Sequence, residues 1–272
     1  MKAVFNFTVV EADKIPVNLP NRAFQYGDGL FETLVLQNGQ VRYIADHYHR
    51  LTGGMAALQI NVSSGLTPEW LQNSIAELAQ INVLGNQARA RLQVWRQPGG
   101  LYTPVSSEAD FLLTVYPLVQ PTVSVKEKVI FYEDVRLQYS AISSFKTCSA
   151  LPYVLAGLTR KAAGTDDAIL LDNAGHIAEC VASNLFWFKD GQLFTPSLQT
   201  GCVEGILRKN SIRQAHQISL SVTEGLFTKQ AILSAQCVFC CNVAGIQLIR
   251  QINGTVFDVN PDWMPWLLSL LQ

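Results

Sequence analysis

Short stretches of alternating apolar and polar residues run through the first half of the chain and predict half-buried β-strands. Two of these stretches flank Asn38-Gly39, a dipeptide preferred in two-residue turns, and predict a hairpin. The opening residues predict a first strand rather than a signal peptide, because their apolar run is short and no small-residue cleavage site follows. The strands expected in this half lie in residues 1–14, 29–36, 40–44, 89–96 and 110–116.

Two helices are predicted between these strands. Asp46 is the expected cap of a helix through residues 47–58, although Gly53 and Gly54 weaken its middle. A second helix is expected to begin at Thr67-Pro68-Glu69, because proline suits the first turn of a helix.

The second half of the chain predicts a similar mixture of elements. Residues 166–196 alternate between apolar and polar, with turns at Asn173-Ala174-Gly175 and Asp190-Gly191, which implies three or four antiparallel strands. A hairpin is expected at Asn253-Gly254. The other expected elements are a strand at 128–133 and helices at about 149–163, 206–216 and 228–236.

The stretch YPLVQPTVSV, residues 116–125, carries two prolines and no helical period, and it predicts the boundary between the two halves. The expected organisation is an N-terminal domain at 1–117, a linker at 118–124 and a C-terminal domain at 125–272. The fold class is α+β in two parts, with long antiparallel sheets.

Composition narrows the class of protein. Of the 272 residues 49% are hydrophobic and 15% are charged, which argues against disorder and favours a buried subunit interface. The net charge of -1 removes the electrostatic signature of a nucleic-acid binder, and no stretch approaches the ~18 apolar residues of a membrane span. Six cysteines in mostly apolar surroundings predict reduced thiols in a cytoplasmic protein. CVFCC at 237–241 lacks a second cysteine pair or a nearby histidine, so no metal site is expected.

Lys146 is the only charged residue in SSFKTCSALPYVLA, residues 143–156. Such a lysine can lay its stem on apolar surface and extend its ammonium into water. It can also be a desolvated amine with a depressed pKa, ready to form a Schiff base. The stretch alone favours the first interpretation.

Two further polar residues stand at unexpected positions. Strand periodicity in HIAECV, residues 176–181, places Glu179 on the face of Ile177 and Val181, where a buried carboxylate needs a partner. Arg96 ends an apolar face of its strand. Each could also mark a strand end that emerges into solvent.

A glycine-bearing turn at TGCVEGILRKN leads into a helix at Gly205-Ile206. Its free backbone N–H groups and the positive end of the helix dipole predict an anion site. The chain lacks the glycine-rich motifs of Rossmann and P-loop proteins, which argues against those chemistries.

A lysine, a buried carboxylate and an anion-binding helix start are what pyridoxal phosphate (PLP) requires. In order and spacing these residues resemble the class IV aminotransferase family, the fold type IV PLP enzymes. The resemblance implies a smaller N-terminal α/β domain and a C-terminal pseudo-barrel domain that hold the cofactor between them, and a homodimer. It rests on RAFQYGDGLFET (22–33), HYHRL (47–51), FKTCSALPYVLA (145–156), AECVASNLFWFKDGQLFTP (178–196) and GCVEGILR (201–208).

The resemblance also implies roles for individual residues. Lys146 would be the Schiff-base lysine and proton carrier, and Glu179 the partner of the pyridine nitrogen. Thr33 falls where the lyases of the family carry a threonine near the reacting centre, and Ser149 stands where the family often has asparagine. Phosphate binding is implied for Arg50, Gly205, Ile206, Leu207 and Asn242, and substrate binding for Tyr26, Arg96 and Tyr102.

The family contains several reactions on amino-acid-like small molecules. The motifs, Thr33 and the short chain favour a 4-amino-4-deoxychorismate lyase, which eliminates pyruvate and gives 4-aminobenzoate, a folate precursor. YGDGLFE, with Arg96, also resembles D-amino-acid aminotransferases, so a transaminase acting on branched-chain or D-amino acids with 2-oxoglutarate stays open. A non-catalytic member of the family is the remaining alternative.

Overall fold

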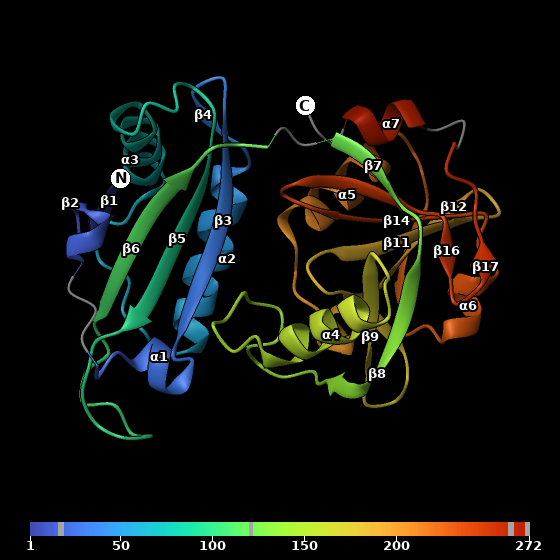
Figure 1. Cartoon of the computed structure of the whole chain (residues 1–272), viewed down its shortest axis with the longest axis horizontal. Helices are drawn as coiled ribbons and strands as arrows, with labels where there is room; N and C mark the ends of the chain where they lie inside the picture. Colours follow the sequence, from blue (N-terminus) through green and yellow to red (C-terminus); the bar gives the residue numbers. More distant parts are fainter. Residues whose placement is uncertain (16–18, 120–121, 261–263, 270–272) are drawn as a thin grey trace. The chain divides into compact units, whose positions relative to one another are not determined.

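The computed structural model folds the chain into two compact units, each described here by itself (Figure 1). The first unit combines Met1–Val119 with Phe145–Ser149, and the second combines Gln120–Ser144 with Ala150–Gln272. Lys146 therefore belongs to the first unit, although residues of the second flank it on both sides. The residues that the structure describes are 1–15, 19–119, 122–260 and 264–269.

The first unit is built on a six-stranded sheet in the order β2-β1-β6-β5-β3-β4, and all of its pairings are antiparallel. The long central pair runs from Gly29 opposite Trp95 to Leu36 opposite Ala88. The strands of the whole sheet are β1 (Lys2–Phe5), β2 (Thr8–Glu11), β3 (Gly29–Gln37), β4 (Gln40–Val41), β5 (Ala88–Arg96) and β6 (Ala109–Tyr116).

Two long helices cover one face of this sheet (Figure 1). Apolar residues at helical spacing, such as Leu51 and Met55 in one and Leu71, Ile75 and Leu78 in the other, join the strand leucines in one buried cluster. The helices of the first unit are η1 (Ala12–Lys14), α1 (Arg22–Tyr26), α2 (Ile44–Ala57) and α3 (Pro68–Ile81).

The structure confirms the hairpin at Asn38-Gly39 and the start of α3, where the Thr67 side chain accepts a hydrogen bond from the backbone N–H of Trp70. Two expectations are wrong in detail. The opening residues form two strands, because Asn6 and Phe7 both have positive φ and turn the chain back. Helix α2 begins at Ile44, so Asp46 lies in its first turn instead of capping it.

The second unit contains a five-stranded sheet, β10-β9-β8-β16-β17, and a six-stranded sheet, β13-β12-β11-β14-β15-β7. Four pairings are parallel, so these sheets are mixed, not purely antiparallel as the sequence predicts. The strands are β7 (Thr122–Lys126), β8 (Val129–Leu137), β9 (Asp167–Asp172), β10 (Ile177–Cys180), β11 (Asn184–Lys189), β12 (Gln192–Pro196), β13 (Val222–Gly225), β14 (Cys237–Asn242), β15 (Gly245–Ile249), β16 (Gln251–Ile252) and β17 (Thr255–Val256).

The core of the second unit lies between its two sheets. Ile169 and Leu171 of one sheet share a buried cluster with Leu185, Trp187 and Val238 of the other.

No helix in the described residues is long and apolar enough to cross a membrane. The helices of this unit are α4 (Leu151–Ala162), η2 (Leu198–Thr200), α5 (Ile206–Gln217), α6 (Lys229–Leu233) and α7 (Met264–Ser269).

The stretch that the sequence assigns to a linker, 118–124, differs in the structure. Strand β7 begins at Thr122 and pairs in parallel with β15. Thr-Val-Ser-Val has the β-branched alternation of a strand, but its partner lies far along the chain. The two prolines of this stretch favoured a linker, but its last residues form a strand whose partner is far away in the sequence.

Candidate active site

Backbone hydrogen bonds hold the segment that carries Lys146 to strand β3. The N–H of Phe31 donates to the carbonyl of Lys146 at 2.9 Å, and the N–H of Cys148 donates to the carbonyl of Gly29 at 2.9 Å. Leu30 and Thr147 form an antiparallel bridge between these two bonds. The backbone of Lys146 is thus fixed at the edge of β3.

The side chain of Lys146 is half-buried and lies beside an aromatic ring. Its Nζ is 4.7 Å from the centroid of Phe31, and the Cζ of Arg91 is 4.0 Å from the same centroid. In the sheet register Thr33 is opposite Arg91 and Phe31 is opposite Gln93, so the four side chains share one face. Two cations and the Thr33 hydroxyl therefore gather on this face.

Two glycines of α2 explain how the neighbouring Phe145 packs. A Cβ on Gly53 would lie 3.1 Å from Cε1 of Phe145, and a Cβ on Gly54 would lie 3.2 Å from Cβ of Phe145 and 3.0 Å from Leu30. The sequence identifies both glycines as weak points of the helix. The structure shows that they leave room for the residue before Lys146.

Replacing Gly54 with alanine is expected to lower the free energy of unfolding by about 1–3 kcal/mol, because overpacking against Phe145 and Leu30 outweighs the better helix propensity. The matched control is Gly157→Ala in α4, where an added Cβ meets only Val181 at 3.8 Å. That variant should be stabilised by up to about 1 kcal/mol. Urea unfolding measures both, and equal effects would contradict the packing argument.

Arg50 is buried in an ion cluster and is not an exposed helix arginine. Its Nε and NH2 donate to the two carboxylate oxygens of Glu32 at 2.8 and 2.6 Å, and Nδ1 of His47 lies 2.7 Å from Glu32. Burial alone would raise the pKa of Glu32, but the charge of Arg50 and the hydrogen bonds from His47 and Arg50 lower it to about 2. These bonds therefore hold the guanidinium of Arg50 in a fixed orientation against Glu32 of β3.

Glu32→Gln is expected to lower the free energy of unfolding by about 3 kcal/mol at pH 7, because it leaves Arg50 and His47 with a weakened buried partner. A lowered folded pKa gives stability that is present above the unfolded pKa of 4.5 and disappears as the pH falls through about 2. The difference between variant and wild type should therefore shrink over that range. Glu11→Gln, in an exposed pair with Lys2, is the control and should change stability little. A pH-independent difference would contradict the charge argument.

In the second unit Glu179 lies on a bulged strand. Ile177 is opposite Leu171 while Glu179 is opposite Leu170, so Ala178 is an extra residue. The predicted alternation is therefore wrong here, and Ile177 and Cys180 point into the same core cluster. Glu179 is nonetheless buried, with 4% of its surface exposed.

Three donors meet the Glu179 carboxylate. The Tyr153 hydroxyl donates at 2.8 Å, the backbone N–H of Val203 at 3.0 Å and Nδ2 of Asn184 at 3.2 Å. Burial, together with the neighbouring Glu179 charge, raises the pKa of Tyr153 above its ordinary value, so its hydroxyl stays a donor. The buried carboxylate thus has the partners that the sequence argument required, but the sequence did not identify them.

The same asparagine connects Glu179 to the start of α5. Nδ2 of Asn184 also donates to the carbonyl of Val203 at 2.8 Å. A Cβ on Gly205, the N-cap, would lie 1.8 Å from Oδ1 of Asn184, so only glycine fits there. Among the described residues no side chain caps α5, and the first-turn N–H groups of Ile206 and Leu207 suit an anion.

The structure shows what surrounds the three residues that the sequence assigns to substrate binding, Arg96, Tyr26 and Tyr102. Nε of Arg96 donates to Asp28 and NH1 to the carbonyl of Gln59, both at 2.9 Å, so this buried guanidinium holds loops of the first unit together. Tyr26 and Tyr102 contact each other with centroids 5.7 Å apart, and Tyr102 is 91% exposed. A substrate-binding role for all three stays a prediction.

Asn242 is engaged by backbone groups of the second unit. Its Nδ2 donates to the carbonyl of Ala182 at 2.8 Å, and its Oδ1 accepts from the N–H of Ala244 at 2.8 Å. The side chain therefore shapes the turn after β14. Its predicted role toward a phosphate also stays a prediction.

Sequence reasoning missed several residues of these clusters: Glu32, His47, Arg91, Tyr153 and Asn184. Arg91 carried a signal, since it stands between Ala90 and Leu92 in a strand, and so did Asn184, which directly precedes the apolar run Leu185-Phe186-Trp187. The partners of Arg50 and Glu179 carried none, because they come together only in the folded units.

Comparisons with known proteins agree with the resemblance found in the sequence motifs. A model of the amino-transferase class IV family matches residues 29–252. Aminodeoxychorismate lyase of Vibrio harveyi is 28% identical over 248 residues, covering 88% of each chain. D-alanine aminotransferase of Bacillus licheniformis is 25% identical over 270 residues, covering 93% of this chain and 89% of the relative.

Solved structures show the same fold. The branched-chain aminotransferase of the archaeon Thermoproteus uzoniensis, solved with norvaline, superposes with a TM-score of 0.90 at 22% identity. The match covers 99% of this chain and 93% of the other. The α+β fold class expected from the sequence is thereby confirmed.

Proposed function

Because the chain belongs to the class IV aminotransferase family and is a PLP-dependent enzyme, we propose that it is a 4-amino-4-deoxychorismate lyase. The observation that supports this reaction most directly is Thr33 on the sheet face of Phe31, the ring that Lys146 contacts. The likeness to the Vibrio harveyi lyase over most of both chains supports it as well.

The residues present fit the cofactor. PLP has an aldehyde, a pyridine nitrogen and a phosphate. For these three groups the chain offers, in the same order, an amine, a carboxylate that accepts hydrogen bonds from three donors, and a helix start without a side-chain cap. In the first unit Lys146 would bind the cofactor covalently and Arg50 would bind phosphate. In the second, Glu179 would hold the proton on the pyridine nitrogen, and phosphate would bind at Gly205, Ile206, Leu207 and Asn242.

Bound PLP supplies an electron sink for the electron pair that remains when a substrate loses a proton. In the proposed reaction the Lys146 amine removes the proton from the substrate carbon that bears the amino group. The C–O bond at the neighbouring carbon breaks, the leaving group departs as the enolate of pyruvate and takes up a proton to give pyruvate, and the substrate ring becomes aromatic. The Thr33 hydroxyl would bind the leaving group.

Arg91 is a second residue that we assign to the substrate carboxylate, beside the predicted Arg96. Its guanidinium shares the Phe31 ring with Lys146, whereas Arg96 already binds Asp28 and two backbone carbonyls. A guanidinium grips a carboxylate with paired hydrogen bonds. Tyr26 and Tyr102 stay proposed substrate contacts.

The direct test supplies aminodeoxychorismate to the purified protein with PLP and follows pyruvate and 4-aminobenzoate. Equal amounts of the two products support the lyase. Turnover of 2-oxoglutarate that depends on a branched-chain or D-amino acid, with no pyruvate from aminodeoxychorismate, would show a transaminase instead. The likeness to D-alanine aminotransferase makes this the second candidate. Absence of both reactions in a protein that binds PLP would favour a non-catalytic member.

A homodimer is the assembly we propose. Helix α4 exposes an apolar stripe at helical spacing: Leu151, Val154, Leu155 and Leu158 are 43–71% exposed. A second copy would remove this surface from water. Light scattering should give the mass of a dimer, and Leu155→Glu should shift it towards a monomer. A wild-type monomer would refute the dimer.

The proposed location is the cytoplasm. All six cysteines are free, and five of them are buried, as suits a reducing compartment. Fractionation of the producing cells tests this directly, and recovery from an extracellular fraction would contradict it.

A further inference from the structure

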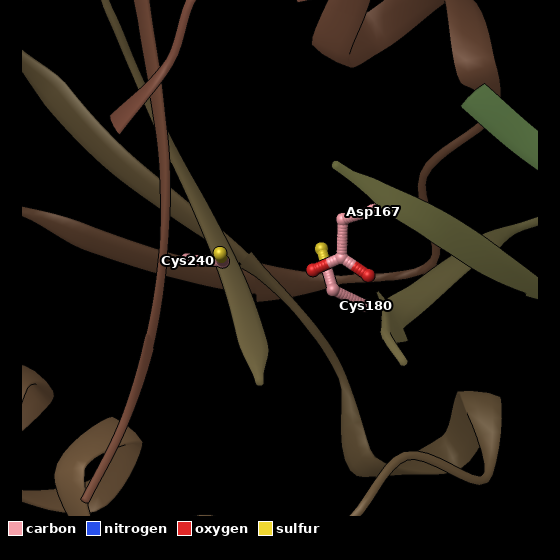
Figure 2. Close-up of side chains that lie close together, drawn as sticks. All are labelled: Asp167, Cys180 and Cys240. Carbon is pink, nitrogen blue, oxygen red and sulfur yellow. The ribbon is translucent and has the colours of Figure 1, made fainter. Parts of the chain in front are cut away.

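A buried cluster of two thiols, a carboxylate and a lysine lies in the second unit, and none of its members has a role in the proposed reaction. Figure 2 shows Asp167, Cys180 and Cys240 together, and one ligand atom of each lies within 4.8 Å of the others. Cys180 ends β10 in the five-stranded sheet, whereas Cys240 lies in β14 of the six-stranded sheet. The two sulfurs therefore face each other across the core between the sheets.

Lys126 of β7 provides the positive charge of this cluster. Its Nζ forms an ion pair with Asp167 and lies 3.4 Å from Sγ of Cys240. The ammonium thus occupies the position where a metal ion would need to sit, between the carboxylate and a sulfur. Its side chain is 18% exposed, whereas Cys180 and Cys240 are both 0% exposed.

The two thiols have unequal tendencies to ionise. A hydrogen bond from Cys180 and the charge of Lys126 lower the pKa of Cys240, although burial opposes them. The same hydrogen bond and burial raise the pKa of Cys180. A thiolate beside a protonated thiol is the pairing that supports disulfide formation, since the thiolate reacts first and the thiol resolves the product.

We propose that Cys240 and Cys180 are a peroxide-reactive thiol pair that forms a disulfide between β14 and β10. The Cys240 thiolate attacks an oxygen of hydrogen peroxide, the O–O bond breaks, and a sulfenic acid and hydroxide form. The Cys180 sulfur then attacks the Cys240 sulfur, the S–O bond breaks, and water leaves with the thiol proton. Two electrons pass from the thiols to peroxide, and a solvent proton neutralises the hydroxide.

Lys126 has two functions in this step. It stabilises the Cys240 thiolate before the reaction, and its side chain is the most exposed of the four in the cluster, so a small oxidant is expected to enter beside it. After oxidation its charge stays paired with Asp167. The disulfide joins the two sheets of the second unit through β10, the strand that carries Glu179.

The test treats the purified protein with hydrogen peroxide at pH 7 in a Cys148→Ser background, because Cys148 is the one cysteine that is not buried. Mass spectrometry of the intact, unblocked protein should find a product lighter by about 2 Da, and a digest made after free thiols are blocked should contain a peptide pair linked through Cys180 and Cys240. Cys241→Ser should give the same product. Cys180→Ser should instead give a Cys240 that gains oxygen in steps of about 16 Da.

Two charge variants separate the proposed chemistry from general loosening of the core. Lys126→Gln should slow oxidation by roughly 10-fold or more, because the thiolate loses its cation. Asp167→Asn should speed it, because Lys126 then serves Cys240 alone. Loosening would speed both variants and would overturn the role of Lys126. No linked peptide, or a Lys126–Cys240 crosslink heavier than the reduced protein, would overturn the disulfide.

Discussion

Lys146→Met is expected to lower kcat by at least roughly 10³-fold, because the variant has no amine to bind the cofactor or to move a proton. Methionine is unbranched and of similar length, so it still fills the space beside the Phe31 ring. The backbone bonds of Lys146 to β3 do not involve its side chain and should persist. Release of 4-aminobenzoate under saturating substrate, with added PLP, measures the effect.

The control is Lys161→Met, in the exposed last turn of α4. Both variants should unfold at nearly the same urea concentration as the wild type. Borohydride reduction should attach PLP to the Lys146 peptide in the wild type and in Lys161→Met, and to no lysine in Lys146→Met. Attachment at another lysine, or retained turnover, would remove Lys146 from its proposed role.

Glu179→Gln is expected to lower kcat by roughly 10²–10³-fold, because the buried charge that we propose to hold the proton on the pyridine nitrogen is lost. The amide also brings donors to a position that already faces three donors, from Tyr153, Val203 and Asn184. Steady-state kinetics at saturating PLP measure kcat, and the visible absorption of the bound cofactor shows whether it is still present.

Two further variants show whether the charge or the packing matters. Tyr153→Phe removes one donor but keeps the carboxylate, so its loss of kcat should be smaller than that of Glu179→Gln. Glu133→Gln, in an exposed ion pair, should leave kcat unchanged. An equal loss in Tyr153→Phe and Glu179→Gln would indicate that the hydrogen-bond network, not the charge, sets the rate.

The amino-acid sequence alone predicted the elements whose signals are local. The Asn38-Gly39 hairpin and the Thr67-Pro68 helix start depend on residues that are adjacent in the chain, and both are confirmed. The family, the fold class and the cofactor also followed from motifs, which are contiguous by definition. The strand at Thr122 was missed because its partner, β15, is distant in the sequence.

Only the tertiary structure decided what surrounds each polar side chain. The sequence identified Arg50 and Glu179 as candidates, but Glu32, Tyr153 and Asn184 became their partners through packing of separate elements. The bulge at Ala178 likewise changed the face on which its neighbours lie, since it depends on the pairing with β9. Buried charges must be paired, and this requirement makes partners necessary without specifying them. The sequence thus determined which chemistry the chain carries, and the fold determined which atoms perform it, because hydrogen bonds and ion pairs depend on distances that only the folded chain defines.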